Sequence, residues 1–131
     1  VYALIDCLLR KGWEVLVETG GHVPLDRVPS AVVKIMDVKC PGSGEAEQHD
    51  WNNLRWLTDH DQMKFVLRDR IDYEFARDAV VERDLVARCA AVLMSPVHGV
   101  LAPKTLAKWV LADECVTKKA VQTLANTHLV A

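Results

Sequence analysis

Apolar residues along the chain follow two different spacings. Residues 1–12 carry apolar side chains at positions 1, 4, 5 and 8, which form one face of a helix, and Lys11-Gly12 is a typical helix end. Four short stretches are apolar almost throughout, which is typical of buried strands. These predicted strands are "WEVLVETGG" (13–21), "AVVKIMDVK" (31–39), "QMKFVLRD" (62–69) and "CAAVLMSPV" (89–97).

Helical spacing returns between and after the strands. Asp50 is a predicted cap for a short helix over 51–57, and Asp69 or Asp72 for a helix over 72–87. Pro103 suits the first turn of a final helix. The residues after it are ambiguous, with a possible last strand. The predicted inner faces carry Trp51, Leu54 and Leu57 or Trp56; Tyr73, Ala76, Val80 and Ala87; and Leu106, Trp109 and Val110.

The predicted fold class is α/β. Strands with little polar alternation are buried on both faces, which indicates a parallel sheet covered by helices. The connection between the first two strands (residues 22–30, "HVPLDRVPS") contains two prolines and shows no helix pattern. A length of 131 residues fits one domain.

Composition excludes several classes of protein. The net charge of -2 gives no basic field for nucleic acid, and no apolar run is long enough to span a membrane. The four cysteines (7, 40, 89 and 115) form no C-x-x-C pair, so we expect reduced thiols in a cytoplasmic protein. The five histidines form no H-x-x-x-H and no Cys/His pair, so no metal site is predicted from this chain.

Polar residues follow each predicted strand. Because the carboxyl ends of parallel strands meet at one edge, we expect these tips to form one pocket. Gly, Pro, Asp and Ser also end strands as ordinary turn residues, so one polar strand tip does not distinguish a turn from a binding site. Four polar tips together favour a pocket. The tips are Glu18-Thr19-Gly20-Gly21; Asp37, Lys39 and Pro41-Gly42-Ser43-Gly44; Arg68-Asp69-Arg70; and Ser95-Pro96 with His98 and Gly99.

Three lysines border or interrupt the apolar strands. A buried lysine is costly unless it is paired, so each one either meets a charge or extends its ammonium to solvent. For Lys39 and Lys64, a ligand-facing role and an extended role both remain open. Lys34 is predicted to extend to solvent.

Four motifs in this order resemble 7-carboxy-7-deazaguanine synthase, a family of radical S-adenosylmethionine enzymes. They are "LVETGG", "DVKCPGSGE", "MKFVLRDRIDYEFAR" and "LMSPVHGVL" with "LAKWVL". Gly20 stands where the family has Asn or Ser. The resemblance covers residues 1 to about 113, and the family's terminal Gln-x-His-Lys order is absent from "VQTLANTHLVA".

The resemblance implies that residues 1–131 are the C-terminal part of an incomplete (β/α)6 barrel. The implied reaction converts 6-carboxy-5,6,7,8-tetrahydropterin into 7-carboxy-7-deazaguanine by a radical ring contraction with loss of ammonia, in queuosine biosynthesis. The implied cofactors are S-adenosylmethionine, a [4Fe-4S] cluster and Mg²⁺, and the implied oligomer is a homodimer.

Site residues are also implied by position in the motifs. Glu18 would contact the ribose of S-adenosylmethionine. The same cofactor would be bound by Thr19 and by the strand-end segment Asp37, Val38 and Lys39. Arg68 would lie near it on the next tip. Ser95 and Pro96 would close the pocket.

The family's three-cysteine cluster motif and its Gly-Gly-Glu motif are missing here. Val1 is not an initiator methionine and already lies in a helix pattern, so we expect a fragment that is inactive alone. Two alternatives remain: another radical S-adenosylmethionine enzyme, and a non-enzymatic α/β module that binds a nucleoside-like ligand.

Overall fold

The computed structural model describes residues 1–46, 49–117 and 122–123. Its centre is a sheet of five parallel strands whose order in space is their order in the chain. The strands are β1 (Leu16–Thr19), β2 (Val33–Val38), β3 (Gln62–Leu67), β4 (Ala91–Pro96) and β5 (Gln122–Thr123). All four predicted strands are confirmed, together with a short fifth.

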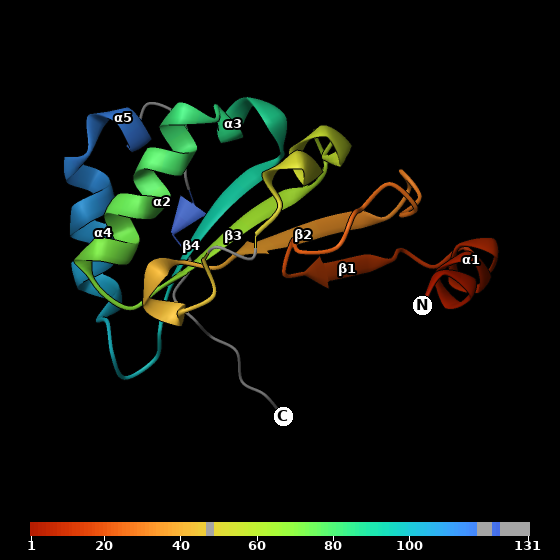
Figure 1. Ribbon diagram of the computed structural model, residues 1–131, viewed down its shortest axis with the longest axis horizontal. Helices are drawn as coiled ribbons and strands as arrows, with labels where there is room; N and C mark the ends of the chain where they lie inside the picture. The colour runs from red at the N-terminus through yellow and green to blue at the C-terminus, as the bar shows by residue number, and fades with distance from the viewer. Residues whose placement is uncertain (47–48, 118–121, 124–131) are drawn as a thin grey trace.

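The helices also confirm most of the prediction. They are α1 (Tyr2–Arg10), α2 (Arg70–Glu82), α3 (Leu85–Arg88), α4 (Pro103–Ala112) and α5 (Glu114–Thr117) (Figure 1). Among the described residues between β2 and β3 are the 3-10 helices η1 (Pro41–Ser43) and η3 (Trp51–Trp56). The connection from β1 to β2 has no helix, as predicted. No helix in the described part of the chain is long and apolar enough to cross a membrane.

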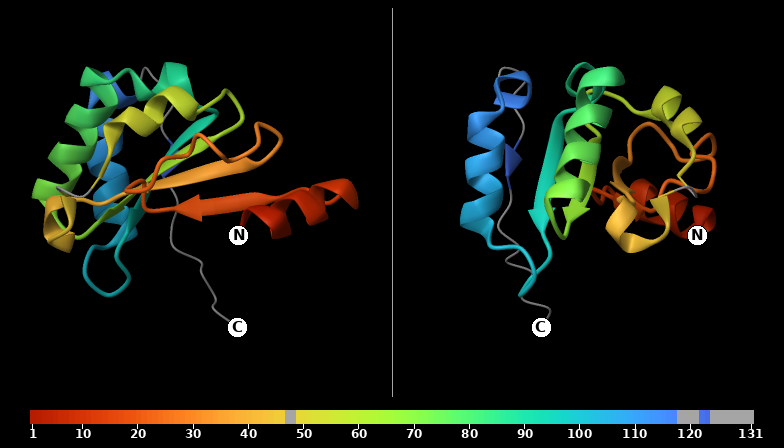
Figure 2. Two further views of the ribbon diagram at one scale, coloured as in Figure 1. Left: turned by 45° about the vertical axis from the view of Figure 1, so that its right-hand side comes forward. Right: turned by 60° about the vertical axis from the view of Figure 1, so that its left-hand side comes forward.

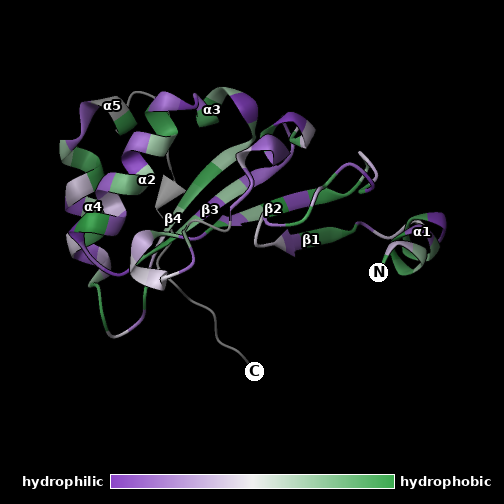
Figure 3. Cartoon of the chain, in the orientation of Figure 1, coloured by the Kyte–Doolittle hydropathy of each residue, from purple (hydrophilic) through white to green (hydrophobic). Residues whose placement is uncertain are grey.

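The helix predicted over 72–87 is interrupted. It ends at Glu82, and Asp84 takes a left-handed conformation (φ 49°) before α3 begins. Ala87 is exposed, so its predicted place in the buried stripe is wrong, whereas Tyr73, Ala76 and Val80 are buried. Figure 3 shows the alternating hydrophobic and hydrophilic bands of α2 that this stripe produces.

One face of the sheet forms the main core. Alternate residues of the central strands pack against side chains of α2, α3 and α4, and Figure 2 shows these helices around the sheet. A second, smaller core joins α1 to the residues just before β1 and β2, through Ile5, Val15 and Val32. The sheet side of the main core is made of Met36, Val38, Met63, Phe65, Leu67, Val92 and Met94.

The opposite face of the sheet is less buried at β2 and β3. The intervening residues of β2 and β3 are only partly buried, so the prediction of strands buried on both faces is wrong there. Parallel strands in chain order with helices between them are also the arrangement of (β/α) barrels. That this sheet is the later part of such a barrel stays a prediction.

A buried ion pair fixes the amino-terminal edge of the sheet. Lys34 Nζ lies 3.0 Å from Asp61 Oδ2, and both side chains are buried. Asp61 also accepts hydrogen bonds from the Lys34 and Thr58 main-chain N–H groups, at 2.7 Å each. Burial by itself would raise the pKa of Asp61, but the bonds from Lys34 and Thr58 outweigh it and lower that pKa. The predicted extension of Lys34 to solvent is therefore wrong.

We expect Asp61→Asn to lower the free energy of unfolding by roughly 3–5 kcal/mol, because it leaves a buried ammonium without a counter-charge. Adding Lys34→Met removes that ammonium, so the double variant should lose less than the two single losses added together. Urea unfolding of the four proteins measures this coupling. Strictly additive losses would show that the pair does not act as a unit.

Candidate functional site

A pocket opens at the carboxyl-terminal edge of the central strands. Its walls come from the tips of β2, β3 and β4, where the sequence predicts a pocket. The lining residues are Asp37, Val38, Lys39, Cys40, Ser43, Val66, Arg68 and Val97. Four of the eight predicted site residues therefore meet in one place.

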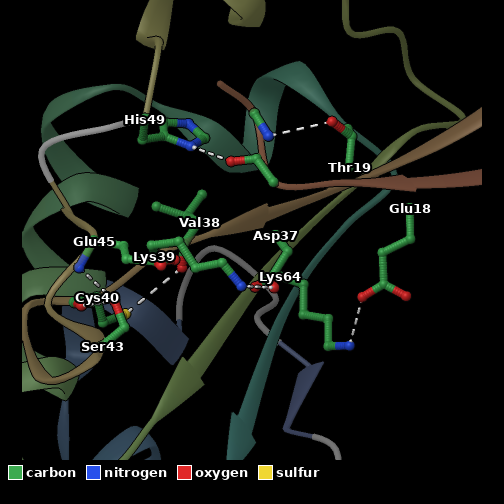
Figure 4. A network of polar contacts seen from close by, with 12 residues as sticks. Glu18, Thr19, Asp37, Val38, Lys39, Cys40, Ser43, Glu45, His49 and Lys64 are labelled. Atoms are coloured by element: carbon green, nitrogen blue, oxygen red, sulfur yellow. Dashed lines mark hydrogen bonds and ion pairs between the residues drawn. The ribbon is translucent and has the colours of Figure 1, made fainter. Parts of the chain in front are cut away.

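The tip of β2 supplies two of the three charged residues in the pocket lining, Asp37 and Lys39. Lys39 Nζ lies 2.8 Å from Asp37 Oδ2 (Figure 4). The hydrogen bond to Asp37 raises the pKa of Lys39, so the ammonium stays charged. The other oxygen, Asp37 Oδ1, is buried and has no hydrogen-bond partner in the described structure. A buried carboxylate oxygen without a donor is costly, and a ligand hydroxyl or amino group would satisfy it.

Glu18 lies beside the pocket rather than in its lining. Glu18 Oε1 accepts a hydrogen bond from Lys64 Nζ at 2.9 Å, and this ion pair reaches from β1 to β3 across β2 (Figure 4). The strand register places Lys64 opposite Asp37, so two acidic and two basic groups stand together here. Lys64 is paired with an acid in the structure, which is neither of the two interpretations left open for it.

Thr19 supports a turn. Its Oγ1 accepts a hydrogen bond from the Gly21 N–H at 3.2 Å. Ser95 is buried and Pro96 ends β4, but neither lines the pocket; the next residue, Val97, does. Val97 N–H donates to Leu67 O at 2.9 Å, which fixes the end of β4 against β3.

The loop after β2 turns sharply beside the pocket. Ser43 Oγ donates to Cys40 O at 2.6 Å, and Gly44 adopts φ 74°, which favours glycine. Cys40 is buried, and burial raises the pKa of its thiol to about 12. Its thiol therefore stays protonated and packs in the main core.

His49 is a buried residue that the sequence prediction missed. Its Nδ1 lies 3.3 Å from Gly20 O, its ring packs edge-on against Trp51, and its Nε2 is buried without a partner among the described residues. Gly21 (φ 72°) lies so close that a Cβ there would collide with the imidazole. Burial lowers the pKa of His49, although the bond to Gly20 opposes it. His49 thus supports the tip of β1 as a neutral ring.

Asn53 completes that support. Its side-chain amide donates to Gly21 O and Val23 O at 3.0 Å each, and its Oδ1 accepts from the Leu25 N–H at 3.0 Å. Asn53 is buried in a segment predicted to bury Trp51, Leu54 and Leu57 or Trp56. Trp51, Leu54 and Leu57 are partly buried against the core, whereas Trp56 is exposed. The sequence pattern gave no signal of this role for Asn53.

No metal-binding cluster is found in the described ranges, where no three His, Cys, Asp or Glu side chains are placed to hold an ion. These residues do not fit an iron–sulfur cluster. The strand-tip charges and the free Asp37 oxygen do fit an organic ligand that carries hydroxyl, amino and carboxylate groups.

The known proteins described next are similar to this chain and share one name. 7-Carboxy-7-deazaguanine synthase from Koribacter versatilis is 42% identical over 131 positions, which cover 91% of this chain and 58% of the relative. The synthase from Chlorobaculum tepidum is 31% identical over 92% of this chain and 56% of its own length. The synthase from Methanospirillum hungatei is 35% identical over 70% of this chain and 37% of its own length. No protein-family model matches, and no solved structure matches.

A prediction follows from the buried imidazole of His49. Because the folded pKa lies below the unfolded value of 6.5, the stability from this residue is complete above about pH 6.5 and is lost as the pH falls toward the folded pKa. We expect the wild-type protein to lose more unfolding free energy between pH 7.5 and 5.5 than His49→Gln does. Urea titrations at both pH values measure the difference. An equal loss in the two proteins would contradict burial of a neutral His49.

The chain spans less than two thirds of the length of these relatives. The similarity to the Koribacter versatilis synthase extends over 91% of this chain. The chain is thus related to part of the 7-carboxy-7-deazaguanine synthases, which confirms the family resemblance carried by its motifs.

Proposed function

We propose that this chain is the C-terminal, ligand-binding part of a radical S-adenosylmethionine lyase that makes 7-carboxy-7-deazaguanine from 6-carboxy-5,6,7,8-tetrahydropterin. The observation that carries the proposal is the strand-tip pocket with its unpartnered Asp37 oxygen, in a chain whose relatives bear that synthase name. The shared name also favours this function over another enzyme of the radical class and over a non-enzymatic module.

The proposed roles follow from the chemistry of each side chain. Glu18 accepts hydrogen bonds from the ribose hydroxyls of S-adenosylmethionine, and Lys64 holds its carboxylate toward the pocket side of the sheet. Asp37 Oδ1 accepts a hydrogen bond from a ligand N–H or O–H. Lys39 and Arg68 supply positive charge for a carboxylate, which both S-adenosylmethionine and the pterin carry.

The remaining proposed roles are structural. Thr19 keeps the tip of β1 turned, Val38 supplies apolar wall, and Ser95 with Pro96 sets the direction in which Val97 enters the pocket. Bound S-adenosylmethionine would supply the radical chemistry of the ring contraction. We propose that the ligands of the [4Fe-4S] cluster and of Mg²⁺ lie outside these 131 residues, and that the chain is inactive without them. A cytoplasmic homodimer is proposed for the whole enzyme.

The test is turnover by the whole protein that contains this chain, reconstituted anaerobically with iron and sulfide and supplied with Mg²⁺, a one-electron reductant such as dithionite, S-adenosylmethionine and the carboxy-tetrahydropterin. We expect 7-carboxy-7-deazaguanine and ammonia, detected by mass spectrometry and an ammonia assay. Glu18→Gln should raise the KM for S-adenosylmethionine roughly tenfold, because a neutral amide makes weaker bonds to hydroxyls than a carboxylate does.

Glu14→Gln is the matched control. Glu14 is an exposed glutamate just before β1, at the opposite edge of the sheet, and its substitution should leave the KM unchanged. Product formation with equal KM values for S-adenosylmethionine in both variants would show that Glu18 is not part of the binding site. No product from a fully reconstituted protein would contradict the proposed function itself.

A further inference from the structure

One buried carboxylate joins the two strand-tip loops that carry the pocket. Asp72 lies in the first turn of α2 and is 1% exposed. Its Oδ1 accepts a hydrogen bond from the Gly42 N–H at 2.7 Å, and its Oδ2 accepts one from the Arg68 N–H at 2.9 Å. Gly42 belongs to the loop after β2 and Arg68 follows β3, so one side chain holds both loops.

A carboxylate is well suited to this task. Its two oxygens accept in different directions, and charge-assisted bonds of this kind are about twice as strong as neutral ones. The start of a helix also favours negative charge. Asp69 caps α2 and accepts a hydrogen bond from the Asp72 N–H at 3.0 Å, so the main chain that carries the carboxylate is itself fixed.

Gly42 and Arg68 are fitted closely to Asp72. A Cβ on Gly42 would lie 2.7 Å from Asp72 Oδ2 and 3.2 Å from Arg68 Cδ, so no other residue fits there without movement. Arg68 Nη1 donates to Gly42 O at 2.8 Å. Arg68 is therefore bound to the same loop twice, through Asp72 and through its own guanidinium. The two loops are coupled, and a shift of one displaces the other.

We propose that Asp72 is a positioning residue for the ligand pocket. Through Gly42 and Arg68 it fixes the distance between the Lys39–Ser43 side of the pocket and the Arg68 side. Asp72 itself does not line the pocket. The inference rests on the proposed function, since it concerns how tightly that pocket holds S-adenosylmethionine.

The first test compares binding of S-adenosylmethionine by wild type, Asp72→Asn and Asp72→Ala in the whole protein, by isothermal titration calorimetry. Each is measured where its urea curve shows full folding. We expect the Kd to rise on the order of tenfold or more in Asp72→Ala, because small displacements of binding groups are costly, and to rise less in Asp72→Asn, which keeps one acceptor.

Asp61→Asn is the control for a purely structural effect. Asp61 is an equally buried carboxylate that also accepts main-chain N–H bonds, but it lies at the amino-terminal edge of the sheet. Its substitution should lower stability and leave the Kd within about twofold of wild type. A Kd that rises equally in Asp61→Asn, or that does not rise in Asp72→Ala, would overturn the proposal.

A second readout does not depend on the ligand. Amide hydrogen exchange should speed up on the order of tenfold or more at Gly42 and Arg68 in Asp72→Ala, which removes both acceptors, while the amides of β3 and β4 keep their rates. Unchanged exchange at these two amides would overturn the positioning role. If the wild-type protein does not bind S-adenosylmethionine, the proposed ligand is wrong, and the exchange result then decides the role of Asp72 by itself.

Discussion

The parallel alignment of the strands is the constraint on which the site depends. Parallel strands bring their carboxyl ends to one edge, and alternation sends successive side chains to opposite faces. On β2, Met36 and Val38 therefore enter the helix-covered core, while Asp37 faces the other way toward Lys39 and the pocket. The same register brings Lys64 beside Asp37 and within reach of Glu18.

The two edges of the sheet each contain a buried carboxylate, and the two carboxylates have different roles. Asp61 joins β2 to the residues before β3 through an ion pair with Lys34. This ion pair stabilises the fold. Asp72 is satisfied by main-chain N–H groups alone among its described hydrogen bonds, and these belong to the pocket loops. Rigid edges of this kind keep the charged tips in place without a ligand.

Local patterns predicted the elements well and the long-range polar contacts poorly. Apolar runs revealed the four strands, and turn residues after them revealed Asp37, Lys39 and Arg68 as neighbours in space. The contacts that were missed join distant positions: Asp61 is 27 residues from Lys34, and Asp72 is 30 from Gly42. No local spacing encodes such a partner, so Lys34 was expected at the surface and Asp72 only as a cap. His49 and Asn53 were missed for the same reason.

Backbone chemical-shift changes on adding S-adenosylmethionine test the strand-tip pocket most directly. The pocket geometry predicts that the shifts cluster at the tips, at residues 37–43, Arg68 and Val97, with smaller changes near Glu18. The amino-terminal edge around Lys34 and Asp61 should stay unchanged. Shifts centred on that edge, or none at saturating ligand, would contradict a ligand site at the carboxyl ends of the strands.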